Sequence, residues 1–253
     1  MANKYVDPFL LKKELLENWS KYLLGSLMLG LTAVCSAFLY GTNGGLTPLL
    51  PGITGSPALE PAAYTLYIAN RWGAGTLPQL GAVVAIVLGM GSFSLERARG
   101  TLLFLLNTPL TRETIFRTKT CAGLLLLCGS LLVSVLVLCL TSRLLGYSLA
   151  AGPFTAGFFL TLAGLFFIFQ LTIFFSVLSA DPVKAGVASA FCCFLLYSAG
   201  LFNKTRFLSP FYYMGGGTYL QGGPYPWLYL LIILAATFIL YSLGRRFWHR
   251  LEV

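Results

Sequence analysis

The sequence predicts an all-α polytopic membrane protein with six transmembrane helices. Of its 253 residues, 57% are apolar and only 10% are charged, whereas soluble domains have roughly 45–50% apolar and about 25% charged residues. The mean hydropathy of +0.79 agrees. A helix needs about 20 residues to cross a hydrocarbon layer of about 30 Å, so this apolar content is enough for six spans. The composition excludes a soluble enzyme, a nucleic-acid-binding domain and a disordered chain.

Six apolar runs define the predicted spans of a single transmembrane domain, residues 1–253. Their approximate bounds are 23–40, 77–93, 121–140, 154–178, 185–202 and 227–243. Residues 41–74 and 203–225 are rich in Gly and Pro and are predicted to form loops.

The residues before the first span predict a separate amphipathic helix. Asp7-Pro8 has the form of an N-cap followed by proline at the first helical position. Leu11, Leu15 and Trp19 recur on one helical face, while Glu14 falls with the other charged residues on the opposite face. We expect this helix to lie in the membrane interface with Trp19 at headgroup depth. The alternative is an amphipathic turn that merges into the first span.

The distribution of Lys and Arg predicts the orientation of the chain. With the N-terminus inside, 13 of the 17 basic residues fall on the inner side, and an excess of Lys and Arg marks the cytoplasmic side. Both termini are therefore expected to be cytoplasmic, and an even number of spans agrees with this.

Few residues in the spans could carry chemistry. No Asp, Glu, Lys or Arg lies in the middle of a predicted span, and the single histidine is His249, near the C-terminus. Gln170, with Thr172 nearby, is the candidate for lining a pathway, although an interhelical hydrogen bond would also explain Gln170. The cysteines lack metal-site spacing, so no metal is predicted. Without a G-x-x-x-x-G-K-[ST] motif, ATP binding through a P-loop is not expected. With one histidine near the C-terminus, neither a Ser/His/Asp set nor an H-E-x-x-H motif is possible, so no catalysis is expected.

The most informative segment is residues 94–113, between the second and third spans. Its charged start is followed by an apolar run, Leu102–Leu106, that is too short to cross the membrane. We therefore expect a short cytoplasmic helix that ends at Pro109 and docks on another surface. A solvated loop that only follows the positive-inside rule would explain the basic residues. It would not explain why Glu96, Gly100-Thr101 and the break at Pro109 occur together in this segment.

This segment resembles the cytoplasmic coupling segment of the membrane subunits of type-2, exporter-type ABC transporters (the ABC-2 permease family). That segment has the approximate pattern E-R-x-x-G-T-L-x-x-L-L-x-x-P-[hydrophobic]-[ST]-R, followed by a basic position. The matching residues are Glu96, Arg97, Gly100, Thr101, Leu102, Leu105, Leu106, Pro109, Leu110, Thr111, Arg112 and Lys119. The six-span layout, the N-terminal helix and Ser209–Tyr213 resemble the same family. Ala98 and Leu103 depart from it, since family members often carry acids there.

The resemblance implies a permease subunit of an ABC exporter, a multi-pass protein of the prokaryotic plasma (inner) membrane. Separate cytoplasmic ATPase subunits would bind ATP and Mg²⁺, so this chain would hold no cofactor itself. A second permease copy or a sister permease would complete the route, with no nucleic-acid partner. Residues 4–21 would form a connecting helix and residues 203–225 a partly re-entrant external lid. The residues implied in ATPase coupling are Glu96, Arg97, Arg99, Gly100, Thr101, Leu105, Pro109, Thr111 and Arg112.

Glu96 is expected to accept hydrogen bonds from a basic residue of the ATPase, each worth about 1.5–3 kcal/mol. The alternative is a surface ion pair with Arg97, Arg99 or Lys119, worth about 0–1 kcal/mol. If Glu96 couples, Glu96→Arg is expected to leave folding intact while transport falls.

Two other functions stay open at this stage. An ATP-independent carrier or channel would work when expressed alone. A haem-exporter-type membrane subunit, or one that assembles other membrane proteins, would have a similar six-span layout.

Overall fold

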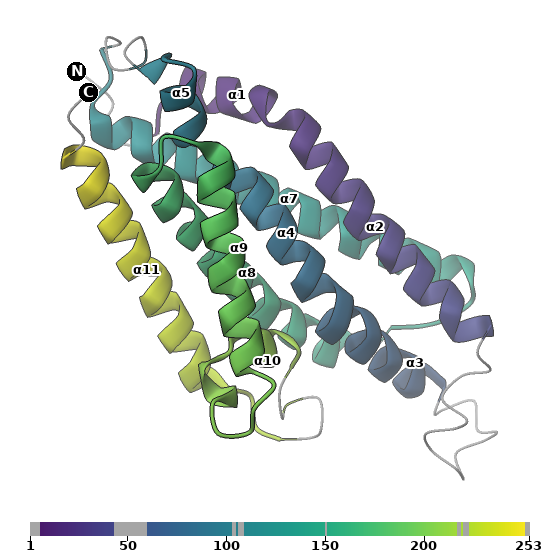
Figure 1. Cartoon of the computed structure of the whole chain (residues 1–253). Coiled ribbons are helices and arrows are strands. Elements are labelled where there is room, and N and C mark those ends of the chain that lie inside the picture. Colours follow the sequence, from purple (N-terminus) through teal and green to yellow (C-terminus); the bar gives the residue numbers. More distant parts are fainter. Residues whose placement is uncertain are drawn as a thin grey trace.

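The computed structural model describes residues 6–42, 60–102, 105, 109–149, 151–216, 219 and 223–250. The regular elements in these ranges are helical, and six helices are long and apolar enough to cross a membrane. This confirms the predicted fold class. The spanning helices are α2 (Trp19–Thr42), α4 (Leu77–Met90) with the helical turns before it, α7 (Arg112–Leu144), α8 (Ala151–Leu178), α9 (Pro182–Ala199) and α11 (Trp227–Arg250). They pack into one bundle (Figure 1).

Several helices extend beyond the predicted spans. α7 begins at Arg112, nine residues before the predicted start at 121, and α11 continues past 243 to Arg250. These extra turns carry charged side chains, which hydropathy excludes from a span but which have good helix propensity. α9 begins earlier than predicted because Asp181 caps it, accepting a hydrogen bond of 2.8 Å from the Val183 amide.

Residues 60–74 do not form the predicted loop. α3 (Glu60–Ile68) continues through the π-helical segment η1 (Ala69–Thr76) into α4. Tyr64, Ile68 and Trp72, spaced by four, are each at most 1% exposed. Proline and glycine suggested a loop, but Pro61 lies in the first turn of α3, where proline is tolerated. Burial of the three large side chains then offsets the poor helix propensity of the glycines. Residues 43–59 of the predicted loop lie outside the described residues.

The amphipathic N-terminal segment forms its own helix, α1 (Pro8–Glu17), separated from α2 by Asn18 alone. The predicted cap is confirmed, since the Asp7 carboxylate accepts a hydrogen bond of 2.8 Å from the Leu10 amide. α1 packs against the start of α7. Trp19 is 51% exposed, whereas Leu11 and Leu15 are half-buried; the headgroup depth of Trp19 stays a prediction.

Most of the described basic residues gather at one end of the bundle. α1, α5 (Ser94–Ala98), the start of α7 and the end of α11 lie together there (Figure 1). Together with Arg99, which follows α5, and the starts of α2 and α9, these segments hold 12 of the 16 described Lys and Arg residues. We call this the charged end.

α8 is the centre of the bundle and packs against α4, α9 and α11. Glycines let the helices approach closely, as is common in membranes. A β-carbon at Gly81 would lie 2.7 Å from Leu165 Cδ1, and one at Gly89 would lie 3.0 Å from Thr172 Cβ. At Gly123 of α7, a β-carbon would overlap the ring of Phe169, which is fully buried.

Gly123→Ala is therefore expected to destabilise the bundle by about 1–3 kcal/mol, the usual cost of overpacking. The measurement is thermal unfolding in detergent, followed by circular dichroism. Gly157→Ala on α8 is the control, because no atom lies within 4 Å of the added β-carbon there. Phe169→Leu in the same chain should recover part of the loss. Equal unfolding of the two alanine variants would contradict this account of the contact.

At the opposite end, aromatic side chains and a short helix close the bundle. Tyr40, Tyr64 and Tyr147 pack with ring centroids 4.7–5.1 Å apart, and the Tyr64 hydroxyl lies 2.7 Å from the Ser142 hydroxyl. Within the predicted lid, the described residues include η2 (Arg206–Leu208) and α10 (Pro210–Met214). α10 packs against α8 and buries Met214.

Candidate functional site

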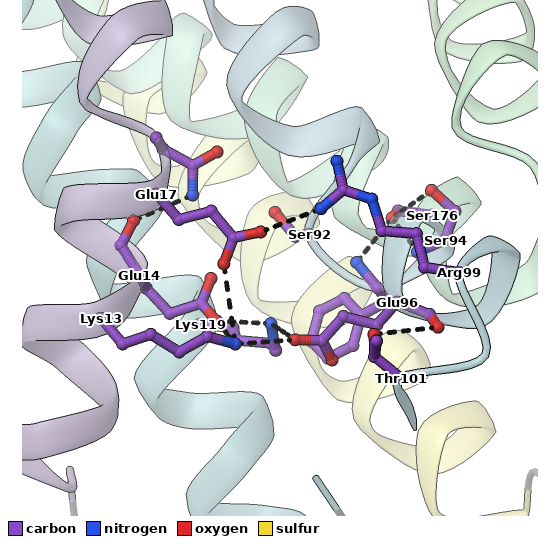
Figure 2. Close-up of polar contacts among 12 residues, drawn as sticks. Lys13, Glu14, Glu17, Ser92, Ser94, Glu96, Arg99, Thr101, Lys119 and Ser176 are labelled. Carbon is purple, nitrogen blue, oxygen red and sulfur yellow. Dashed lines mark hydrogen bonds and ion pairs between the residues drawn. The ribbon is translucent and has the colours of Figure 1, made fainter. Parts of the chain in front are cut away.

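A buried ammonium group lies between two carboxylates at the charged end (Figure 2). Lys119 Nζ lies 2.6 Å from Glu14 Oε1 and 2.9 Å from Glu96 Oε1. The Lys119 side chain is only 2% exposed, and its ammonium group lies 5.9 Å from the centroid of the Phe93 ring. These three charged residues, the buried triad, come from α1, α5 and α7 and therefore join those elements directly.

Exposed charges form a rim around the triad. Lys13 Nζ lies 3.4 Å from Glu96 Oε1 and 3.6 Å from Glu17 Oε2, and Arg99 lies 3.6 Å from Glu17. Partial burial lowers the pKa of Lys13, but the nearby Glu96, Glu14 and Glu17 outweigh this, so its pKa is raised from 10.5. Lys13 is thus charged at neutral pH, and with Lys119 it balances the two buried carboxylates.

The buried triad corrects the expectation for Glu14, which does not lie on a solvated face, since it is 4% exposed. Glu96 pairs with Lys119, as in the alternative to an ATPase contact, but the pair is buried and not at the surface, since Glu96 is 8% exposed. The part of Glu96 in ATPase coupling stays a prediction. The sequence signal for this pairing was the position of Lys119, the last charged residue before the uncharged run 120–142, where a buried lysine is stabilised by a carboxylate partner.

Arg97 also acts within the chain. Its guanidinium donates hydrogen bonds of 2.9 Å to the Val177 carbonyl and 3.4 Å to the Ser179 carbonyl. These carbonyls lie at the end of α8, where unpaired oxygens and the helix dipole favour a cation. Arg97 therefore attaches α5 to the central helix of the bundle.

Gly100 and Thr101 end α5 in a Schellman motif. The Gly100 amide donates to the Arg97 carbonyl at 3.1 Å, and the Thr101 amide donates to the Glu96 carbonyl at 3.0 Å. Gly100 has a φ of +69°, which glycine adopts without the strain that a β-carbon would cause. The Gly-Thr pair of the sequence motif thus has a local structural role, the sharp turn after α5.

Thr111 and Arg112 organise the start of α7. The Thr111 hydroxyl caps the helix by accepting a hydrogen bond of 3.1 Å from the Thr114 amide. Arg112 donates to the His249 carbonyl at 3.2 Å, and the buried Trp248 indole donates to the Arg112 carbonyl at 2.8 Å. The end of α11 is thereby joined to α7, a connection that the sequence did not reveal.

The predicted coupling residues therefore separate into two groups. Glu96, Arg97 and Arg112 are buried or half-buried and bond to other elements of the bundle, whereas the others are mostly exposed, and of these Arg99 also pairs with Glu17 of α1. The exposed ones are Arg99, Gly100, Thr101, Pro109 and Thr111, with Leu105 half-buried. Together with the exposed Ala98, Arg99–Thr101 and Pro109 form a surface that we call the docking surface, after the role predicted for this segment. Residues 103, 104 and 106–108 lie outside the described residues.

Gln170 and Thr172 lie within the packing of α8. Thr172 is fully buried against Gly89, and its hydroxyl donates to the Ile168 carbonyl at 2.9 Å. Gln170 is 2% exposed, and its Nε2 has no hydrogen-bond partner among the described residues. Their suggested part in a pathway stays a prediction. Where the chain is described, no group of three or more His, Cys, Asp or Glu side chains could hold a metal ion.

Comparison with known protein families identifies the family of this chain. The model of the ABC-2 family transporter proteins matches residues 17–202, about three quarters of the chain. The match runs from the start of α2 to just past α9 and includes α5 and the docking surface. No curated protein matches the sequence. The six spans and the family match together make the chain a member of the ABC-2 family of membrane transport proteins, a permease subunit of an ABC transporter.

Proposed function

We propose that this permease moves its substrate out of the cell, driven by ATP hydrolysis in a separate cytoplasmic ATPase. The observation that carries the proposal is the attachment of α5. The buried triad joins α5 to α1 and α7, and Arg97 joins it to α8. A force on the docking surface would reach three other helices through hydrogen-bonded contacts, without relying on a flexible loop.

In this mechanism the partner ATPase would bind ATP and Mg²⁺, and this chain would convert the movement of the ATPase into movement of its own spanning helices. Closure of a pair of ATPase subunits would press on the docking surface, with the charged end on the cytoplasmic side. α1 would move with α5 because Glu14 and Glu96 share Lys119. A second copy or a sister permease would supply the other half of the route.

The docking surface is tested by Ala98→Trp, which adds bulk at an exposed position of α5. The variant is expected to reduce the ATPase that copurifies from native membranes at least tenfold, equal to about 1.4 kcal/mol, because the ring would hold the two surfaces apart. Mass spectrometry identifies the copurified protein, and its ratio to the permease gives the effect.

Lys204→Trp is the matched control, since Lys204 is exposed at the opposite end of the bundle. Both variants should unfold at the wild-type temperature. Equal copurification of the ATPase with both variants would place docking elsewhere. ATP hydrolysis by the purified chain alone would contradict the assignment of ATP hydrolysis to a separate ATPase.

A further inference from the structure

The exposed face of α11 changes from apolar to basic near its C-terminal end. The residues on this face follow one another at intervals of three or four. They are Trp227, Leu231, Leu234, Phe238, Ser242, Arg245 and His249. The first four are 44–69% exposed, so this stripe lies on the outside of the bundle, where lipid surrounds a membrane protein.

The basic part of the stripe borders a cleft of 460 Å³. Its lining residues are Ser242, Arg245, Arg246, His249 and Arg250. Arg245 forms an ion pair with Glu113, since its guanidinium lies 2.9 Å from the Glu113 carboxylate. Arg246 and Arg250 are exposed and make no ion pair within the part of the chain that is described. The cleft thus presents guanidinium groups without carboxylates among its lining residues.

The length of α11 places this cleft at headgroup depth. Trp227 begins the helix, and tryptophan is enriched at the membrane–water interface. Arg245 follows 18 residues later, which corresponds to about 27 Å of helix, close to the hydrocarbon thickness of about 30 Å. The guanidinium groups therefore lie where the phosphates of the other leaflet would be.

We propose that this cleft binds the phosphate headgroup of an anionic phospholipid. Guanidinium groups bind phosphate oxygens through paired, charge-assisted hydrogen bonds, and the Ser242 hydroxyl adds a further donor. The acyl chains would lie along the exposed apolar stripe of the same helix. This continuity favours a lipid over a soluble phosphate or an acidic protein surface. The proposal does not depend on an ATPase partner.

The test compares binding of phosphatidylglycerol and phosphatidylcholine to the full chain in detergent, by native mass spectrometry. The double variant Arg246→Gln/Arg250→Gln is expected to weaken phosphatidylglycerol binding roughly 30-fold, since each arginine near an anionic surface contributes about 1 kcal/mol and 1.4 kcal/mol is tenfold. The control Lys204→Gln/Arg206→Gln removes two charges at the opposite end and should bind as the wild type. Arg245 is left unchanged because it pairs with Glu113.

Unchanged phosphatidylglycerol binding by the double variant would overturn the proposal, as would equal binding of phosphatidylcholine. Displacement of the lipid by millimolar inorganic phosphate would point to a soluble anion and also overturn it. If the double variant kept the lipid but lost the copurified ATPase, the cleft would be a protein contact. Both double variants should unfold at the wild-type temperature, so that weaker binding reports the cleft.

Discussion

Lys119→Met is expected to lower the free energy of unfolding by about 3–5 kcal/mol, the usual effect of breaking a buried ion pair. Methionine fits the apolar surroundings beside Phe93, but it leaves Glu14 and Glu96 buried without the ammonium group that both contact. Since whole domains are stable by only about 5–15 kcal/mol, this loss is a large fraction of the total stability. The measurement is thermal unfolding of the purified chain in detergent, followed by circular dichroism.

Two further variants separate the charge effect from the loss of the lysine side chain. Lys184→Met removes a lysine that is exposed at the start of α9 and should leave stability unchanged. Glu14→Gln/Glu96→Gln/Lys119→Met removes all three buried charges and should recover most of the stability, because no unpaired ion is then buried. If Lys119→Met unfolded at the wild-type temperature, the triad would make no contribution to stability.

Glu96→Arg is expected to prevent accumulation of folded protein, a larger effect than that of Lys119→Met. The new guanidinium would lie beside Lys119 and Lys13, which contact the native carboxylate at 2.9 and 3.4 Å. Three cations would then face Glu14 in a buried site, where like charges repel more strongly than in water. The measurement is the yield of monodisperse protein by size-exclusion chromatography. This revises the expectation from the sequence that the reversal would leave folding intact.

Exchange of the charges provides the sharpest test of that contact. Glu96→Arg/Lys119→Glu restores a pair of opposite charges between α5 and α7 and should recover part of the folded yield. Glu96→Arg/Lys184→Glu has the same net charge but does not rebuild the pair, since Lys184 is exposed at the start of α9, and it should not recover the yield. A Glu96→Arg chain that folds normally but loses the copurified ATPase would instead support the original hypothesis that Glu96 bonds to the partner.

Local features were predictable from the sequence because their causes lie within a few residues. The Asp7-Pro8 start of α1 needs only a carboxylate and a proline at the right spacing. The turn at Gly100 likewise depends on local backbone preference, although the sequence pattern indicated only a coupling role for Gly100. Residues 60–74 were misassigned because their helix depends on the burial of Tyr64, Ile68 and Trp72 against other helices.

By itself, the sequence determined the number of membrane-spanning helices and the family, because both depend on composition and on short-range order along the chain. Only the tertiary structure decided which charged residues are buried. Glu14 and Lys119 are 105 residues apart, and Glu96 precedes Lys119 by 23. The sequence does not show whether a carboxylate is hydrated at the surface or paired with a buried ammonium group. The packing of α1 and α5 on α7 excludes water from all three, so residues that look like surface charges in the sequence instead connect α1 and α5 to α7.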